Sequence, residues 1–322
     1  LFHTESSDWS EKSIPRVQSL ARLLVLTYLT LSVCCVLSYW LAGMSLFDAV
    51  NHAMATVSTG GFATDDRSMG RFSLGILWVS IVFMLLSALP FTLLIGFFRR
   101  PSMDLLRNQQ VRGFFAIIAA VSLVLTADLI DLHVFAPFEA FTQATFNLVS
   151  VITTTGFASA DYTQWGSFSI ALFFVVTFIG GCSGSTSGGM KVFRFQLSYL
   201  FLRSQIRKLI HPSGVFVTQY NGRPVQDDII LSAVAFSFLF FVTLAVVTLL
   251  LALMGLDLMT SLTAAATALT NVGPGLGDIV GPAGNFASLP VAAKWLLSFA
   301  MLMGRLELLT LMVLFTPMFW RG

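Results

Sequence analysis

The sequence has little charge, few cysteines and few histidines, and each shortage excludes a class of protein. Only 11% of its 322 residues are charged, whereas soluble domains carry roughly a quarter. The three cysteines, Cys34, Cys35 and Cys182, all lie inside apolar stretches, so we expect neither a disulfide framework nor a cysteine-ligated metal. The four histidines have neither a metal-binding spacing nor a serine partner, so we expect no enzyme.

Apolar residues, in contrast, make up 56% of the chain and gather in long uncharged stretches. Five such stretches contain 20 to 29 residues each: 23–47, 72–98, 162–190, 229–256 and 258–277. A helix of about 20 apolar residues crosses the hydrocarbon core of a bilayer. The sequence therefore predicts an all-α, multi-pass membrane protein.

Charge is divided unequally between alternate connecting segments. One set carries fourteen basic and six acidic residues, and the other carries three basic and nine acidic residues. The positive-inside rule places the basic set in the cytoplasm and the acidic set outside. Acidic outer loops would concentrate cations near the protein. Ordinary solvated loops would produce the same pattern.

Three similar short motifs recur along the chain. Residues 57–64 read VSTGGFAT, residues 152–159 read ITTTGFAS and residues 269–274 read LTNVGP. The short stretches with helix-forming character that precede these motifs are 46–56, 138–151 and 257–268. A helix of 11 to 14 residues is about 16–21 Å long, too short to cross a bilayer. We therefore expect three re-entrant half-helices, each followed by an extended loop that lines a shared water-filled cavity.

The composition of the three loops suits a monovalent cation. Small serine, threonine and glycine residues allow backbone carbonyl oxygens to converge and replace the hydration shell of potassium. The half-helices would point their negative C-terminal ends at the same place. The candidate filter residues, and the only candidate metal ligands, are Ser58, Thr59, Gly60, Gly61, Thr154, Thr155, Gly156, Asn271, Val272 and Gly273. Ordinary turns would explain one such motif, but they explain three at matching positions poorly.

At these residues the sequence resembles the Trk/Ktr/HKT superfamily of potassium transporters, most closely its bacterial TrkH branch. The residues that carry the resemblance are STGGF at 58–62, TTTGFA at 153–158, GGCSGSTSGGMK at 180–191 and TNVGPGLG at 270–277. The resemblance implies span–pore-helix–span repeats around a pseudo-fourfold pore in the bacterial inner membrane. It also implies gated potassium uptake, with no cofactor besides the transported ion.

The same resemblance implies four repeats, of which three are recognisable here. The first would then precede Leu1, and Gly61, Gly156 and Gly273 would be the filter glycines of repeats two, three and four. We expect a cytoplasmic linker at 1–19, followed by repeat two at 20–100, with its filter at 57–62 and a span at 72–98. Repeat three is expected at 101–211, with its filter at 152–157. Repeat four is expected at 212–322, with its filter at 269–275 and a span at 289–319.

A glycine-rich segment at 180–191 interrupts the second span of repeat three. Its five glycines and four serine or threonine residues disfavour a helix. We therefore expect an unwound intramembrane loop that gates the pore below the filter, with the span resuming at 192–202. The candidate gate residues are Gly180, Gly181, Ser183, Gly184, Ser185, Thr186, Ser187, Gly188, Gly189, Lys191 and Arg305. Helix-packing contacts through GxxxG-like spacings remain an alternative for the glycines.

Arg305 lies inside an apolar span, where a charge is costly and is expected to face a cavity or a partner. The resemblance implies that this arginine sits in the pore as a barrier to cations, whereas anchoring of loop carbonyls is the structural alternative. A proton- or sodium-coupled symporter is the alternative function, and Glu307 is its one candidate carboxylate.

The basic segment 194–208 is amphipathic and is expected to contact anionic lipid or a partner protein. The resemblance implies a homodimer and a cytosolic ring of nucleotide-binding regulatory domains like TrkA, and no nucleic acid is expected. We also expect Gly61→Ser or Gly156→Ser to weaken potassium selectivity through carbonyl geometry, with little effect on packing.

Overall fold

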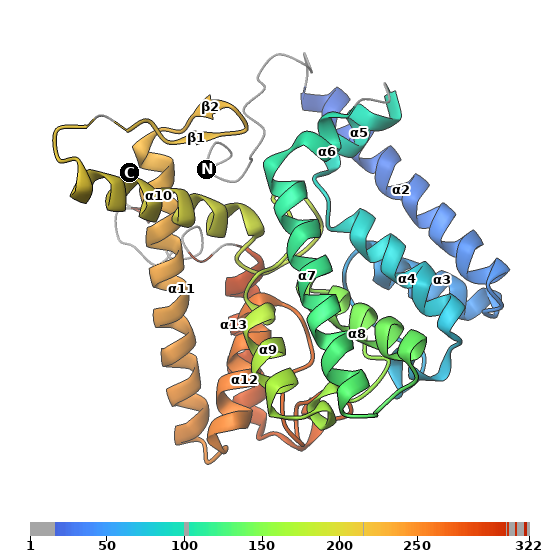
Figure 1. Cartoon of the computed structure of the whole chain (residues 1–322). Coiled ribbons are helices and arrows are strands. Elements are labelled where there is room, and N and C mark those ends of the chain that lie inside the picture. Colours follow the sequence, from blue (N-terminus) through green and yellow to red (C-terminus); the bar gives the residue numbers. More distant parts are fainter. Residues whose placement is uncertain are drawn as a thin grey trace.

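The computed structural model describes residues 17–99, 103–214, 216–306, 308, 313, 319 and 320. The described chain is helical apart from one short β-hairpin, and the predicted all-α membrane fold is confirmed (Figure 1). Within these residues, three helices are long and apolar enough to cross a membrane: Gln18–Leu41, Gln109–Asp131 and Asp227–Leu253.

The first span–half-helix–span unit consists of helices α2 (Val17–Leu41), α3 (Leu46–Val57), α4 (Leu74–Ser87) and α5 (Phe91–Arg99), with a 3-10 turn at Ser68–Arg71. The predicted span at 72–98 is divided in the structure, because α4 and α5 meet at a bend of 99°. Pro90 lies at this bend. Proline lacks a backbone N–H and disfavours helical geometry at the residue before it.

The second unit consists of α6 (Asp104–Arg107), α7 (Gln109–Asp131), α8 (Pro137–Ile152), a 3-10 turn at Tyr162–Trp165, α9 (Ser167–Thr177) and α10 (Val192–Ile210). The loop between α9 and α10 covers the predicted unwound segment. The prediction that the span resumes after this loop is wrong, because α10 runs crosswise to α9 and α11 (Figure 1). The four basic residues of α10 explain this position at the membrane edge, since charge is costly inside the bilayer.

The third unit begins with the hairpin β1 (Gln219–Tyr220) and β2 (Arg223–Pro224). It continues with α11 (Asp227–Leu253), α12 (Leu258–Thr270), a 3-10 turn at Phe286–Ser288 and α13 (Val291–Arg305). The predicted span at 289–319 therefore starts as expected, and most of its second half lies outside the described residues, as does Glu307.

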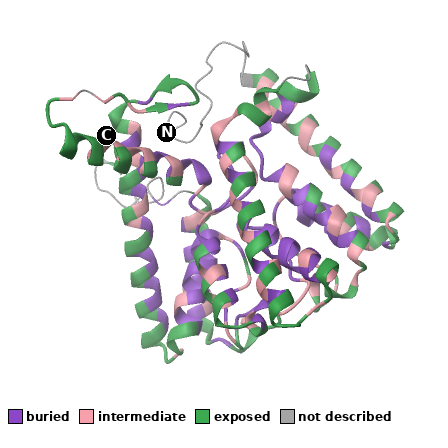
Figure 2. Ribbon diagram, viewed as in Figure 1, coloured by how far each residue is buried: buried purple, intermediate pink, exposed green. Residues whose placement is uncertain are grey.

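The half-helix α8 lies at the centre of the molecule, and the long spans α2 and α11 lie at its edges (Figure 1). Helix α8 is buried along almost its whole length, whereas α2 and α11 expose many large apolar side chains (Figure 2). An exposed apolar surface of this extent is typical of contact with lipid. The cysteines Cys34, Cys35 and Cys182 are all free thiols, as expected.

Candidate functional site

The three predicted filter loops have the same backbone geometry. One or two residues after each half-helix ends, a residue has a left-handed backbone, and a glycine with positive φ follows two residues later. The φ angles are 53° at Thr59, 66° at Gly61, 57° at Thr154, 84° at Gly156, 58° at Asn271 and 114° at Gly273. Glycine adopts a positive φ without a steric penalty, which explains its presence at the second of these two positions in every loop.

The N–H groups of these loops bond back to their own half-helices. In each loop, the residue before the glycine donates to the carbonyl five residues earlier. The bonds are Gly60 N to Ala55 O at 2.7 Å, Thr155 N to Ser150 O at 2.9 Å and Val272 N to Thr267 O at 3.1 Å. The donors are thus occupied on the protein side, which leaves the carbonyls as the groups available to a cation.

Neighbouring loops pack on each other by one repeated contact. A Cβ atom on Gly61 would overlap the carbonyl oxygen of Thr155, and one on Gly156 would overlap that of Val272. Thr155 and Val272 each precede the glycine of their own loop. The same rotation therefore relates the first loop to the second and the second to the third, as expected for loops arranged about an axis. Among the residues of this chain, the atom nearest to a Cβ added at Gly273 is the Cα of Gly156, at 4.0 Å.

Side chains secure the second and third loops. Ser150 donates its hydroxyl to Phe157 O at 2.6 Å. The amide of Asn271 donates to Met301 O in α13 at 3.1 Å, and Gly273 N donates to the hydroxyl of Thr267 at 2.8 Å. These bonds fix loops that have no regular secondary structure. The first loop is more open, because Phe62 is 80% exposed whereas the equivalent Phe157 is fully buried.

The intramembrane loop contacts all three filter loops. Thr59 donates its hydroxyl to Thr186 O at 3.0 Å. Gly188 N donates to the hydroxyl of Thr154 at 2.6 Å, and Gly189 N donates to Thr270 O at 2.9 Å. Thr59 and Thr154 occupy the same position in their loops. The glycine-rich segment predicted as a gate thus lies directly against the candidate filter.

The bend between α4 and α5 holds the other side of this loop. Cys182 N donates to Ala88 O, and Phe91 N donates to Gly184 O, both at 2.9 Å. The hydroxyl of Thr186 donates to Ser87 O at 3.1 Å. The carbonyls at the end of α4 lack partners within their own helix, so the loop satisfies them. Sequence reasoning missed this contact, although Pro90 was the signal for the bend.

The remaining gate candidates divide into two groups. Ser185 donates its hydroxyl to Cys182 O at 2.6 Å, and the ammonium of Lys191 donates to Ser187 O, so these side chains hold the loop together. A Cβ on Gly180 would lie 2.6 Å from Gly188 O, which explains why the loop requires glycine there. Arg305 ends α13, and its exposed side chain has no hydrogen bond or ion pair within the described residues.

Ion pairs organise the acidic surface beside the first filter loop. Asp48 lies in the first turn of α3 and accepts hydrogen bonds from Thr64 at 2.6 Å and Ser45 at 2.8 Å. These two bonds, more than the nearby Arg71, hold the pKa of Asp48 below its ordinary value. Arg71 pairs with Asp48 at 2.9 Å and with Asp65 at 3.3 Å. Part of the acidic charge expected to attract cations is therefore balanced locally.

His52 and the other possible metal ligands do not form a metal site. The Nδ1 atom of His52 lies 2.8 Å from Asp48 O, and its ring lies between Phe72 and Phe157. No group of three or more histidine, cysteine or carboxylate side chains suited to a metal ion occurs in the part of the chain that the structure describes.

Comparison with known proteins gives a consistent result. The chain matches the TrkH family, described as "Cation transport protein", over residues 3–321. It is 55% identical to the Trk system potassium uptake protein TrkI of Halomonas elongata, over 100% of this chain and 65% of that protein. It is 37% identical to TrkH of Vibrio parahaemolyticus, over 97% of this chain and 64% of that protein.

The solved structure of a relative has the same fold. The crystal structure of the potassium transporter TrkH from Vibrio parahaemolyticus matches with a TM-score of 0.90 at 36% identity. The match covers 96% of this chain and 67% of that one. The chain spans slightly less than two thirds of the length of the curated relatives from Halomonas elongata and Vibrio parahaemolyticus.

Proposed function

This chain belongs to the TrkH family of cation transport proteins, and from that premise we propose that it contributes three of the filter loops of a selective pathway for potassium uptake. The observation that carries the proposal is the repeated loop geometry, in which positive φ angles alternate and the N–H groups bond back to the half-helices. Convergent carbonyls can replace the water around a potassium ion. The membrane is the bacterial inner membrane, as for the family.

In this pathway, the filter would consist of backbone oxygens from residues 58–61, 154–156 and 271–273. The residues 180–191 would form the gate, because the loop lies against the filter and contacts each of its three strands. Arg305 would add a positive charge that opposes cations in the pathway.

The partners follow from the family and stay part of the proposal. Two copies would form a homodimer, and a ring of nucleotide-binding domains like TrkA would dock on the cytoplasmic face. The basic helix α10 is a suitable surface for contacts on that face, because it carries Arg203, Arg207 and Lys208 and no acidic residue.

Ion flux through the full-length protein in liposomes tests the proposed function. We expect a reversal potential that follows the potassium gradient, with much lower permeability to sodium and no response to an imposed pH gradient. A reversal potential that tracks protons would instead support the coupled symporter. Absence of selective cation flux from folded protein would overturn the filter assignment.

A further inference from the structure

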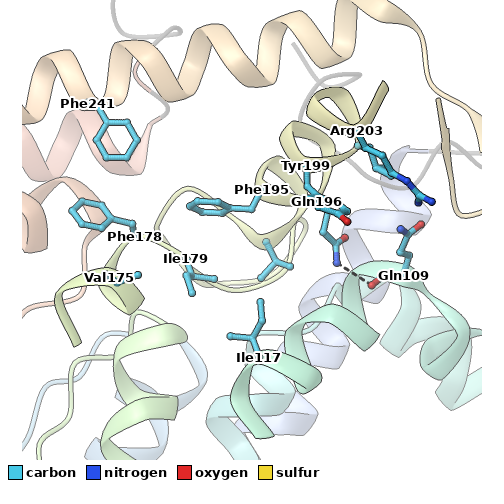
Figure 3. Close-up of a pocket in the computed structure, with 12 residues that line it drawn as sticks. Gln109, Ile117, Val175, Phe178, Ile179, Phe195, Gln196, Tyr199, Arg203 and Phe241 are labelled. Atoms are coloured by element: carbon cyan, nitrogen blue, oxygen red, sulfur yellow. Dashed lines mark hydrogen bonds between the residues drawn. The ribbon is translucent and has the colours of Figure 1, made fainter. Parts of the chain in front are cut away.

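A pocket of about 670 Å³ lies between the membrane-spanning helices and the basic helix α10 (Figure 3). Its walls come from α7, the end of α9, α10 and α11. This volume is in the range of roughly 300–1,000 Å³ that is typical of pockets for a single small ligand. The pocket is separate from the filter loops, and the proposed transport function does not use it.

The lining changes from apolar to polar along the pocket. Phe178, Ile179 and Phe241 lie at one end, and Gln109, Gln196 and Arg203 lie at the other (Figure 3). Arg203 is the only charged residue of the lining. The Gln196 amide donates to Gln109 O at 3.1 Å and accepts from the hydroxyl of Tyr220 at 2.6 Å, so this glutamine is already satisfied. The guanidinium of Arg203 is therefore the group available to a ligand.

The change from polar to apolar lining runs from the cytoplasmic boundary of the membrane toward its interior. Gln109 is the first residue of α7, and its end of the helix belongs to the basic, cytoplasmic side of the charge pattern. Ile117 lines the same pocket eight residues further along α7, which is about 12 Å deeper at the rise of a helix. The polar end therefore lies at the cytoplasmic boundary, and the apolar end extends toward the middle of the bilayer.

The pocket also opens toward the lipid. Val175, Phe195, Tyr199 and Phe241 all line it, and each is at least partly exposed to the surroundings, from 39% for Phe195 to 64% for Tyr199. A chain of methylene groups can enter such an opening sideways from the bilayer without crossing water. A free anion from the cytosol, in contrast, would make no favourable contact with the apolar end of the pocket.

We infer that this pocket binds an anionic phospholipid of the cytoplasmic leaflet, with one acyl chain between Ile117 and Phe241 and the phosphate beside Arg203. Charge complementarity favours an anionic lipid, because α10 has four basic residues and no acidic residue. The bound chain would also contact Ile179 and Val192, which lie immediately before and after the intramembrane loop segment 180–191. The inference concerns binding and does not depend on the proposed transport function.

Native mass spectrometry of the full-length protein tests this site, with phosphatidylglycerol and phosphatidylcholine supplied in mixed micelles. We expect Arg203→Gln to lower the phosphatidylglycerol retained by about fivefold, the order of effect of one basic residue near an anionic membrane. Arg207→Gln is the matched control, because Arg207 is on the same helix and does not line the pocket. Retention of phosphatidylcholine should change little in either variant.

A second pair of variants tests the apolar end. Ile117→Trp should obstruct the apolar end of the pocket and lower the retention of phospholipid of both kinds, whereas Val124→Trp, at an exposed position of α7, should not. Equal phosphatidylglycerol retention in Arg203→Gln and Arg207→Gln, or full retention in Ile117→Trp, would overturn the inference. Loss of dimers in Ile117→Trp with unchanged lipid would assign the pocket to a second copy of the chain and would also overturn it. These measurements do not depend on ion flux, so a failure of the lipid-binding inference can be distinguished from a failure of the transport proposal.

Discussion

At the residue scale, Gly61, Gly156 and Gly273 occupy equivalent positions in their loops. A side chain at Gly61 or Gly156 would overlap a backbone carbonyl of the neighbouring loop. The expectation that serine at Gly61 or Gly156 hardly disturbs packing is therefore wrong. The sequence could not reveal this contact, because the overlapping carbonyls come from loops about 100 residues away.

We predict that Gly61→Ala and Gly156→Ala lower both stability and potassium selectivity. Each needs a shift of the neighbouring loop as well as an unfavourable φ, at a cost of about 1–3 kcal/mol for overpacking and roughly 1–2 kcal/mol for the left-handed backbone. Gly43→Ala carries only the second cost, because Gly43 has a φ of 104° and no heavy atom within 4 Å of an added Cβ, so it is the matched control. Thermal unfolding in detergent and potassium-to-sodium permeability ratios measure the two effects. Equal losses in all three variants would contradict the repeated contact between loops.

At the element scale, the intramembrane loop contacts both the α4–α5 bend and the filter loops. Thr186 of the intramembrane loop takes part in both contacts. Its hydroxyl lies 3.1 Å from both Val57 O and Ser87 O, and its carbonyl accepts from Thr59. Non-helical backbone at membrane depth needs this kind of internal satisfaction. The bend in one unit therefore supports the loop of the next, and movement of the loop requires these bonds to break.

We predict that Thr186→Val increases potassium flux several-fold, because it removes the hydroxyl bonds that hold the loop beneath the filter. Each such bond contributes about 0.5–1.5 kcal/mol. Thr177→Val is the control, since the hydroxyl of Thr177 bonds only to Phe173 O within its own helix. Flux into proteoliposomes at a fixed potassium gradient is the measurement. Unchanged or lower flux in Thr186→Val, with normal thermal stability, would contradict the gate assignment.

At the scale of the whole molecule, the charge asymmetry orients the protein in the membrane. The acidic surface with Asp48 and Asp65 lies beside the filter loops, and the basic helix α10 lies at the other end of the spans (Figure 1). The fully exposed apolar faces of α2 and α11 then face lipid between these two layers.

We predict that a membrane-impermeant maleimide added to intact cells labels Asp66→Cys and leaves Arg207→Cys unlabelled. Both positions are exposed, and the native cysteines would first be replaced by serine or alanine. Disrupting the membrane should make Arg207→Cys reactive and so serves as the control. The opposite labelling pattern would reverse the orientation, and the outer mouth of the proposed pathway would then face the cytoplasm.

The sequence by itself determined the membrane class, the three half-helices and the glycines that follow them in the candidate filter loops. These features depend on local patterns: apolar stretches of fixed length, and short motifs such as the one around Gly156 that repeat in the same order. The predicted half-helix ends differ from the observed ones by only a residue or two. The bend within the predicted span 72–98 was not foreseen, because hydropathy does not register the backbone effect of Pro90.

Only the tertiary structure decided how these local elements meet. The bonds of Thr59 to Thr186 and of Gly188 to Thr154 join residues far apart in the chain, so no periodicity within one segment predicts them. The same holds for the contact of Gly61 with Thr155 and for the crosswise position of α10 (Figure 1). Hydropathy decides which segments leave water, whereas hydrogen-bond satisfaction and steric fit between distant segments decide which of them meet around the pathway.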